Sequence, residues 1–132
     1  MSTKTTTDQQ VETAARAYIE TVGKGDLEPL RDLLDEGLVA VFAGASSTKG
    51  EWITALEQLL PALVRNDILE VFVRGDRACV VYDFVTDTPA GAVRCVELLT
   101  VVDERILAIE LLLDRVVFAP VRTALIERAA QG

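Results

Sequence analysis

The sequence contains no histidine, and this absence excludes several kinds of active site. There is no Ser-His-Asp or Cys-His catalytic group, no histidine metal ligand and no imidazole to carry protons near neutral pH. Glycine-rich phosphate-binding loops and CxxC pairs are also missing. We therefore expect no cofactor and no metal, and any acid–base chemistry must fall to Asp, Glu, Tyr, Lys or Cys.

Basic residues and long apolar runs are also scarce. Thirteen Lys and Arg stand against 21 Asp and Glu, which gives a net charge of −8. A chain this acidic repels phosphate backbones, so a nucleic-acid partner is not expected. No apolar run approaches the ~20 residues that span a bilayer, so we expect no membrane partner. Since the first eight residues are polar and lack a signal core, the expected location is the cytoplasm.

Cysteine is limited to Cys79 and Cys95. Both fall on strands expected to be neighbours, but the pairing expected there places them about 20 Å apart. That separation is too long for a disulfide, so both are predicted to be reduced thiols.

The chain has 132 residues, half of them hydrophobic, which is typical of one globular domain with its own core. We expect a disordered tail over residues 1–7 and a single domain over 8–132. Capping boxes and hydrophobic spacing predict helices and strands in a fixed order. Helices are expected at about 8–22, 26–34, 48–63 and 120–130, and strands at 38–43, 68–74, 77–86, 92–102 and 105–118. Helices followed by a long antiparallel sheet indicate an α+β fold, with a curved sheet wrapped around the N-terminal helices into a cone that holds a cavity.

The hairpin over residues 78–102 carries two carboxylates. Centring its turn on Ala90 places Asp83 directly opposite Glu97, with their Cβ atoms roughly 5 Å apart among apolar neighbours on one face. Two facing acids in apolar surroundings are costly unless they share a proton, bind a cation or contact a ligand. The pattern therefore predicts a pocket. A one-residue slip of the register would instead send one acid to the outer surface.

Other groups have more than one interpretation. Glu110 is expected on the outer face, paired with Arg94, but a tight two-residue turn at 103–104 would bring it beside Glu97. Trp52 is expected in the core or the pocket wall, and Asp114 in a structural contact at a strand end.

Two segments carry a family resemblance. Residues 18–26, Tyr-Ile-Glu-Thr-Val-Gly-Lys-Gly-Asp, resemble the first-helix signature of the nuclear transport factor 2-like superfamily, which includes ketosteroid isomerases and SnoaL-like polyketide cyclases. Residues 102–106 and 111–114 resemble its closing motif, with Glu104 in place of the usual glycine. The resemblance implies the same cone fold, but the superfamily hosts isomerases, hydrolases, dehydratases, cyclases and non-catalytic binders.

The resemblance also implies roles for particular positions. Tyr18 matches the oxyanion-hole tyrosine of ketosteroid isomerases, and Glu97 lies near their protonated acid, while Phe42 occupies the place of their general base. Compared with limonene epoxide hydrolases, Asp83 matches one acid, but Val81 replaces their arginine and Leu111 their second acid. Ala40 and Phe42 stand where those hydrolases have their water-positioning tyrosine and asparagine. Neither known set of residues is complete.

Together these observations predict a SnoaL-like protein that binds an apolar, oxygenated small molecule in the cone. The expected activity is acid–base catalysis of an isomerase, cyclase or epoxide-hydrolase type, and the alternative is a non-catalytic binding or dimerisation module. The expected catalytic residues are Asp83 as base, with Glu97 and Tyr18 as hydrogen-bond donors. The expected substrate-binding residues are Phe42, Trp52, Val81, Val85, Cys95, Leu99, Ile109, Leu111 and Leu113.

The opposite face of the predicted sheet is also apolar, which is unusual for a surface in water. Its members are expected to be Val80, Tyr82, Phe84, Arg94, Val96, Leu98, Thr100, Ala108 and Leu112. Because the helices occupy the concave side, a second copy of the chain is the simplest cover, and the resemblance implies the same homodimer.

Overall fold

The computed structural model describes residues 6–131 and has the predicted α+β architecture. The elements in chain order are α1 (Thr6–Lys24), α2 (Leu30–Leu33), β1 (Leu34–Phe42), β2 (Ala45–Ser47), α3 (Lys49–Leu59), the 3-10 turn η1 (Leu60–Ala62), β3 (Leu63–Arg74), β4 (Arg77–Thr86), β5 (Ala92–Val102), β6 (Arg105–Leu113) and α4 (Arg115–Gln131). The predicted tail over residues 1–7 lies mostly outside the described residues, and α1 already begins at Thr6.

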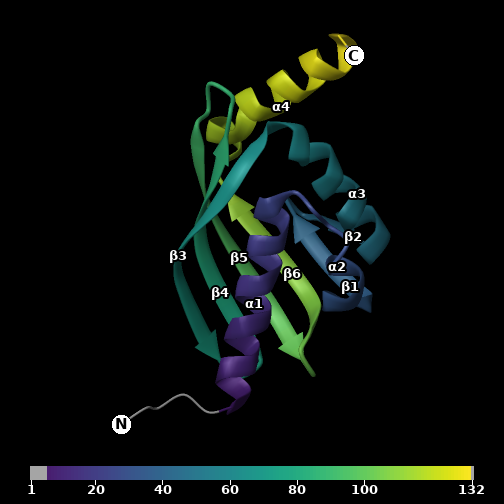
Figure 1. Cartoon of the computed structure of the whole chain (residues 1–132), viewed down its shortest axis with the longest axis vertical. Helices are drawn as coiled ribbons and strands as arrows, with labels where there is room; N and C mark the ends of the chain where they lie inside the picture. The colour runs from purple at the N-terminus through teal and green to yellow at the C-terminus, as the bar shows by residue number, and fades with distance from the viewer. Residues whose placement is uncertain (1–5, 132) are drawn as a thin grey trace.

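One six-stranded sheet forms the body of the molecule, in the order β2-β1-β6-β5-β4-β3. Neighbouring strands are antiparallel except β1 and β6, which run parallel. The sheet is curved and open, and α1 lies across its concave side, with α3 next to β1 and β2 and α4 at one end of the sheet (Figure 1). No helix within residues 6–131 is both long and apolar enough to cross a membrane.

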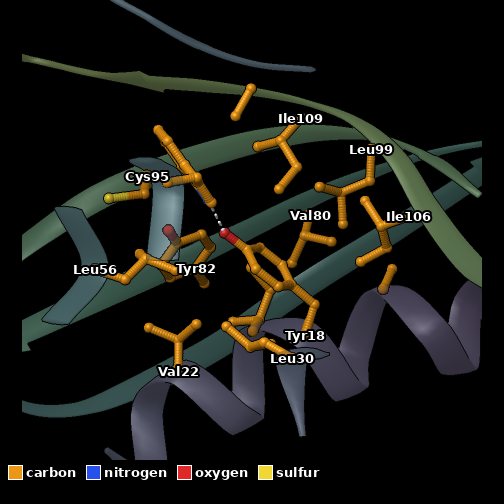
Figure 2. Packing of buried hydrophobic residues seen from close by; sticks show 14 of the residues in the cluster. Tyr18, Val22, Leu30, Leu56, Val80, Tyr82, Cys95, Leu99, Ile106 and Ile109 are labelled. Carbon is orange, nitrogen blue, oxygen red and sulfur yellow. Dashed lines mark hydrogen bonds between the residues drawn. The ribbon is translucent and has the colours of Figure 1, made fainter. Parts of the chain in front are cut away.

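Helix α1 fills one half of the concave side because its apolar residues recur at helical spacing. Val11, Ala15, Tyr18 and Val22 are buried along one stripe. Figure 2 shows Tyr18 reaching from α1 into the group formed by Val80, Leu99, Ile106 and Ile109 of the sheet. The aromatic ring thus forms the boundary between the packed half of the cone and the half that stays open.

The starts of two helices follow from capping side chains. Thr48 and Glu51 form the predicted capping box at the start of α3. At α4, Asp114 Oδ1 accepts hydrogen bonds from the backbone N–H of Val116 (2.9 Å) and Val117 (3.2 Å). This cap confirms the predicted structural role of Asp114. It also begins α4 five residues before the predicted start at Pro120, which lies inside the helix.

Two predicted strand starts were wrong because neighbouring strands extend the pairing, and the predicted end of the last strand at residue 118 was wrong because β6 stops at Leu113, just before α4. Strand β1 begins at Leu34 rather than at residue 38, since Leu34 already pairs with Ile106 of β6. Strand β3 begins at Leu63 rather than at residue 68, since β4 pairs along its whole length. The predicted bounds of β4 and β5 are confirmed.

Candidate active site

The register of the β4–β5 hairpin differs from the prediction by three residues. Asp83 pairs with Arg94, and Glu97 pairs with Val80. The ladder is closed by Thr86, whose backbone N–H and hydroxyl both donate to the carbonyl of Gly91, at 2.9 and 2.8 Å. This pair places the centre of the hairpin before Ala90. Because three is an odd number, the shift moves every side chain of β4 to the other face.

Asp83 is therefore on the convex face of the sheet, and its predicted opposition to Glu97 is wrong. Its carboxyl accepts a hydrogen bond of 2.5 Å from Arg94 Nε. Val81 and Val85 lie on the same outer face, so their predicted place in the pocket is also wrong. The inward side chains of β4 are instead Val80, Tyr82 and Phe84, which the prediction had assigned to the outer face.

Glu110 is also on the convex face, although the tight turn that would have brought it inward does form. Asp103 and Glu104 both have positive φ, 51° and 66°, and join Val102 directly to Arg105. The register then shifts by one residue between Thr100 and Val101. This β-bulge places Glu110 opposite Leu98 and Leu111 opposite Glu97. One inserted residue thus turns Glu110 outward, away from Glu97.

The open half of the cone is a cavity of about 900 Å³. The predicted site residues that line this cavity are Tyr18, Phe42, Trp52, Cys95, Glu97, Leu111 and Leu113. Leu99 and Ile109 also point to the concave side but do not line the cavity, because α1 covers that part of the sheet and buries them in the core. Further walls come from Tyr82 and Phe84 of β4, Asn66 of β3, and α4.

Glu97 is the one acidic side chain among the described lining residues. It is 2% exposed, and its Oε2 accepts a hydrogen bond of 2.6 Å from the hydroxyl of Tyr82. Its Oε1 is buried and has no hydrogen-bond partner among the described residues. Burial raises the pKa of this carboxyl to about 7, although the hydroxyls of Tyr82 and then Tyr18 counteract part of the rise. Near neutral pH, Glu97 is thus present in both protonation states.

The aromatic groups around Glu97 remain neutral hydrogen-bond donors. Trp52 Nε1 donates to the Tyr18 hydroxyl at 2.8 Å, which fixes that hydroxyl within the cavity wall. Burial, and next the charge of Glu97, raise the pKa of both Tyr18 and Tyr82 well above 10. The same two causes raise the pKa of the Cys95 thiol to about 12, so this cysteine is a neutral part of the wall rather than a nucleophile.

The sequence reasoning missed three groups of the site. Tyr82 was assigned to the wrong face, because both faces of β4 are apolar and alternation could not distinguish them. Asn66 was placed before the start of its strand. The wall from α4 was missed because nothing in the sequence indicates where a terminal helix docks. Arg128 anchors this helix by donating to the Pro61 carbonyl at 2.9 Å and to Asp87 at 2.8 Å.

A family model described as SnoaL-like domain matches residues 15–109. The chain belongs to the SnoaL-like domain family. Among curated proteins, no sequence matches this SnoaL-like chain. Its predicted membership of the nuclear transport factor 2-like superfamily is confirmed by the family match and by solved structures of the same fold.

Three of these structures illustrate the likeness. A candidate SnoaL-like polyketide cyclase from Jannaschia sp. CCS1 is 16% identical, with 92% of this chain and 98% of that one covered and a TM-score of 0.75. An NTF2-like protein of unknown function from Mesorhizobium loti is 25% identical, with 84% and 96% covered and a TM-score of 0.70. A candidate ketosteroid isomerase from Kribbella flavida DSM 17836 is 17% identical, with 81% and 79% covered and a TM-score of 0.71. At such identities the likeness establishes the fold and not the reaction.

No group of three or more His, Cys, Asp or Glu side chains within residues 6–131 is arranged to hold a metal ion. The chemistry that the site offers is that of one carboxyl group with phenol and indole donors near it, while Arg122, Arg128 and the amides of Gln58 and Asn66 add polar groups elsewhere in the wall.

Proposed function

We propose that this SnoaL-like protein binds an apolar, oxygenated small molecule in the cavity and transfers a proton on it, as an isomerase or cyclase does. The observation that carries the proposal is the buried carboxyl of Glu97, whose pKa of about 7 lies near neutral pH. A general acid–base group works best under that condition, because both of its forms are abundant. Apolar surroundings maintain the condition, and this is how proteins commonly adjust catalytic carboxyls.

The roles follow from the contacts. Ionised Glu97 takes a proton from the bound substrate, and protonated Glu97 returns it at another atom. Tyr18 is held by Trp52 and stays neutral, so it is the donor that stabilises negative charge developing on a substrate oxygen. Tyr82 donates to Oε2 and keeps the carboxyl in place. An epoxide-hydrolase mechanism needs a second acid in the cavity. Asp83 was the candidate for that role, and its place on the convex face leaves this reaction type without support.

A simple ketone tests the proposal. The probe is 2-acetonaphthone, and the measurement is exchange of its acetyl protons in D₂O, followed by proton NMR. We expect exchange above the buffer rate, rising with pH through about 7 as Glu97 ionises. Glu97→Gln removes the titrating group and should abolish both the excess rate and its pH dependence.

The alternative is a non-catalytic binding module, and two observations favour it. The cavity wall is mostly hydrocarbon, and Phe42 stands where the resemblance to ketosteroid isomerases places a general base. Binding of the ketone, measured by calorimetry, with no exchange above the buffer rate would support this alternative.

The convex face supports a second part of the proposal, a homodimer. Exposed apolar side chains cross this face from β1 to β3, among them Val39 (51% exposed), Leu112 (48%) and Phe72 (55%). A sheet face with several large exposed apolar side chains is typical of an interface between copies. Val80, Tyr82 and Phe84 do not belong to it, because they face the cavity side.

A further inference from the structure

Two cavity residues at different ends of the site carry a buried oxygen without a hydrogen-bond partner among the described residues. One is Oε1 of Glu97 and the other is Oδ1 of Asn66. More than nine in ten buried polar groups in proteins are hydrogen-bonded, so an unpaired one in a cavity wall marks a place for a ligand group or a water. The proposed function uses Glu97 and leaves Asn66 without a role.

Asn66 is held rigidly at the cavity wall. Its Nδ2 donates to the backbone carbonyl of Ile19 in α1 at 3.0 Å. Gly23 makes this contact possible, because a Cβ at that position would lie 2.8 Å from the backbone nitrogen of Asn66. The close approach of α1 to β3 thus fixes the amide plane. Since the amide nitrogen is engaged, the free group of Asn66 is the carbonyl oxygen, which can only accept a hydrogen bond.

Asn66 and the Glu97 region have opposite hydrogen-bonding character. The hydroxyl of Tyr18 and the protonated form of Glu97 are donors, whereas Asn66 Oδ1 is an acceptor. A ligand that pairs with both while Glu97 is protonated therefore presents an acceptor, such as a carbonyl, at one end and a donor, such as a hydroxyl, at the other.

The sheet register sets the spacing of these two ends. Asn66 pairs with Phe84, and Phe84 pairs with Val93, which lies four residues before Glu97 on β5. Two strands across and four residues along correspond to about 16 Å between the Cα atoms on a flat sheet. Both side chains reach inward from a curved sheet, which shortens the span between their polar atoms. Tyr82, Phe84 and Cys95 line the cavity and supply an aromatic and apolar wall.

We propose that Asn66 is a specificity-determining residue that selects ligands with a hydroxyl group at the end remote from Glu97. The substrate class is a hydroxy-ketone whose carbonyl and hydroxyl groups are separated by an apolar body of roughly two fused rings. This inference rests on the proposed function, because the carbonyl end is the one bound at Glu97 and Tyr18. A site with a fixed, buried acceptor rejects an analogue that lacks the donor, since the acceptor is then left unpaired.

A matched pair of probes tests the inference on the full-length protein. The probes are 6-hydroxy-2-acetonaphthone and 6-methoxy-2-acetonaphthone, which share the acetyl group and the ring system but differ in the hydroxyl donor. We expect the wild type to bind the hydroxy probe about tenfold more tightly, as one buried hydrogen bond allows. Titration followed by fluorescence or calorimetry gives both dissociation constants.

Variants then assign the preference to one residue. Asn66→Leu should reduce the tenfold ratio to about one without weakening the methoxy probe. Gln58→Leu is the matched control, because Gln58 is another amide of the cavity wall and is exposed. Its preference for the hydroxy probe should stay at the wild-type value. Asn66→Ala, checked by circular dichroism, replaces Asn66→Leu if that variant fails to fold.

The possible results distinguish a failure of this inference from a failure of the proposed function. Equal affinity of the wild type for both probes would mean that water satisfies Asn66, and would overturn the inference without any variant. Binding of both probes, with acetyl-proton exchange that Glu97→Gln abolishes but with a preference unchanged in Asn66→Leu, would overturn it and leave the proposed function standing. If neither probe binds, the proposed function fails and the inference fails with it.

Discussion

Each face of the β4–β5 hairpin carries one acid, and the environments of the two acids are opposite. Asp83 lies on the convex face, where it accepts a hydrogen bond from the solvent-exposed Arg94. Glu97 on the concave face is buried, accepts a hydrogen bond from the phenol of Tyr82, and has its pKa raised to about 7 by burial. Both are carboxyls on adjacent strands. What distinguishes the buried carboxyl from the surface ion pair is the side of the sheet on which each lies, because only the concave side removes its carboxyl from water.

The largest expected effect is on the rate of proton exchange, and it tests the difference between the two faces. Glu97→Gln should lower the cavity-dependent exchange of 2-acetonaphthone by a factor of roughly 10² to 10⁴, as loss of a general acid–base group does. Asp83→Asn makes the same chemical change on the other face and should leave the exchange rate unaltered. Proton NMR of the acetyl signal gives both rates. A loss of exchange in the Asp83 variant would mean that the two faces are not independent.

The second prediction concerns what covers the convex face. Val96→Asp places a charge in the middle of the apolar outer surface and should convert dimers into monomers or insoluble protein. Light scattering at micromolar concentration measures the mass of both forms. A monomeric wild type would show that this face stays open to water.

The third prediction concerns how the free energy of unfolding depends on pH. Because the pKa of Glu97 rises from 4.5 to about 7 on folding, the folded state binds the proton more tightly than the unfolded state. The neutral form therefore favours folding below pH 4.5, and this advantage is lost as pH rises to about 7. Relative to wild type, Glu97→Gln should gain stability over this window, by up to about 3 kcal/mol at pH 8.

Urea denaturation at pH 4.5 and pH 8 measures that difference. The two proteins should be closest in stability at the lower pH and furthest apart at the higher one. A difference that does not change with pH would mean that Glu97 titrates as a free carboxyl.

A smaller effect is expected from the phenol beside Glu97. Tyr82→Phe removes the hydrogen bond that stabilises the ionised carboxyl, so the pKa of Glu97 should move further above 7. Carbon-detected NMR of the Glu97 carboxyl gives the midpoint. A midpoint that stays in place or falls would contradict the assigned donor role of Tyr82.

The smallest effect is expected on the convex face. Asp83→Asn should leave the urea midpoint within the scatter of the measurement at pH 8, because an ion pair open to solvent adds little to stability. A clear loss of stability would mean that the Asp83–Arg94 pair is buried in the functional protein, for instance against a second copy.

The sequence by itself determined the fold class, the family and the inward direction of β5. Hydrophobic spacing in α1 and the capping box at Thr48 are local signals, and they hold because helix formation depends on residues a few positions apart. Glu97 could be identified as an unusual acid for the same reason, since alternation along β5 places it among Cys95, Val93 and Leu99.

The partners of Glu97 were decided only by the tertiary structure. The pairing of Thr86 with Gly91 shifted the hairpin by three residues and turned Asp83 outward, and a bulge after Thr100 did the same to Glu110. Both are choices of register, and a side-chain period of two makes any odd shift reverse a whole face. Because β4 is apolar on both faces, its composition could not reveal the reversal. Asn66 and the wall from α4 come from contacts between distant parts of the chain, which no local pattern encodes.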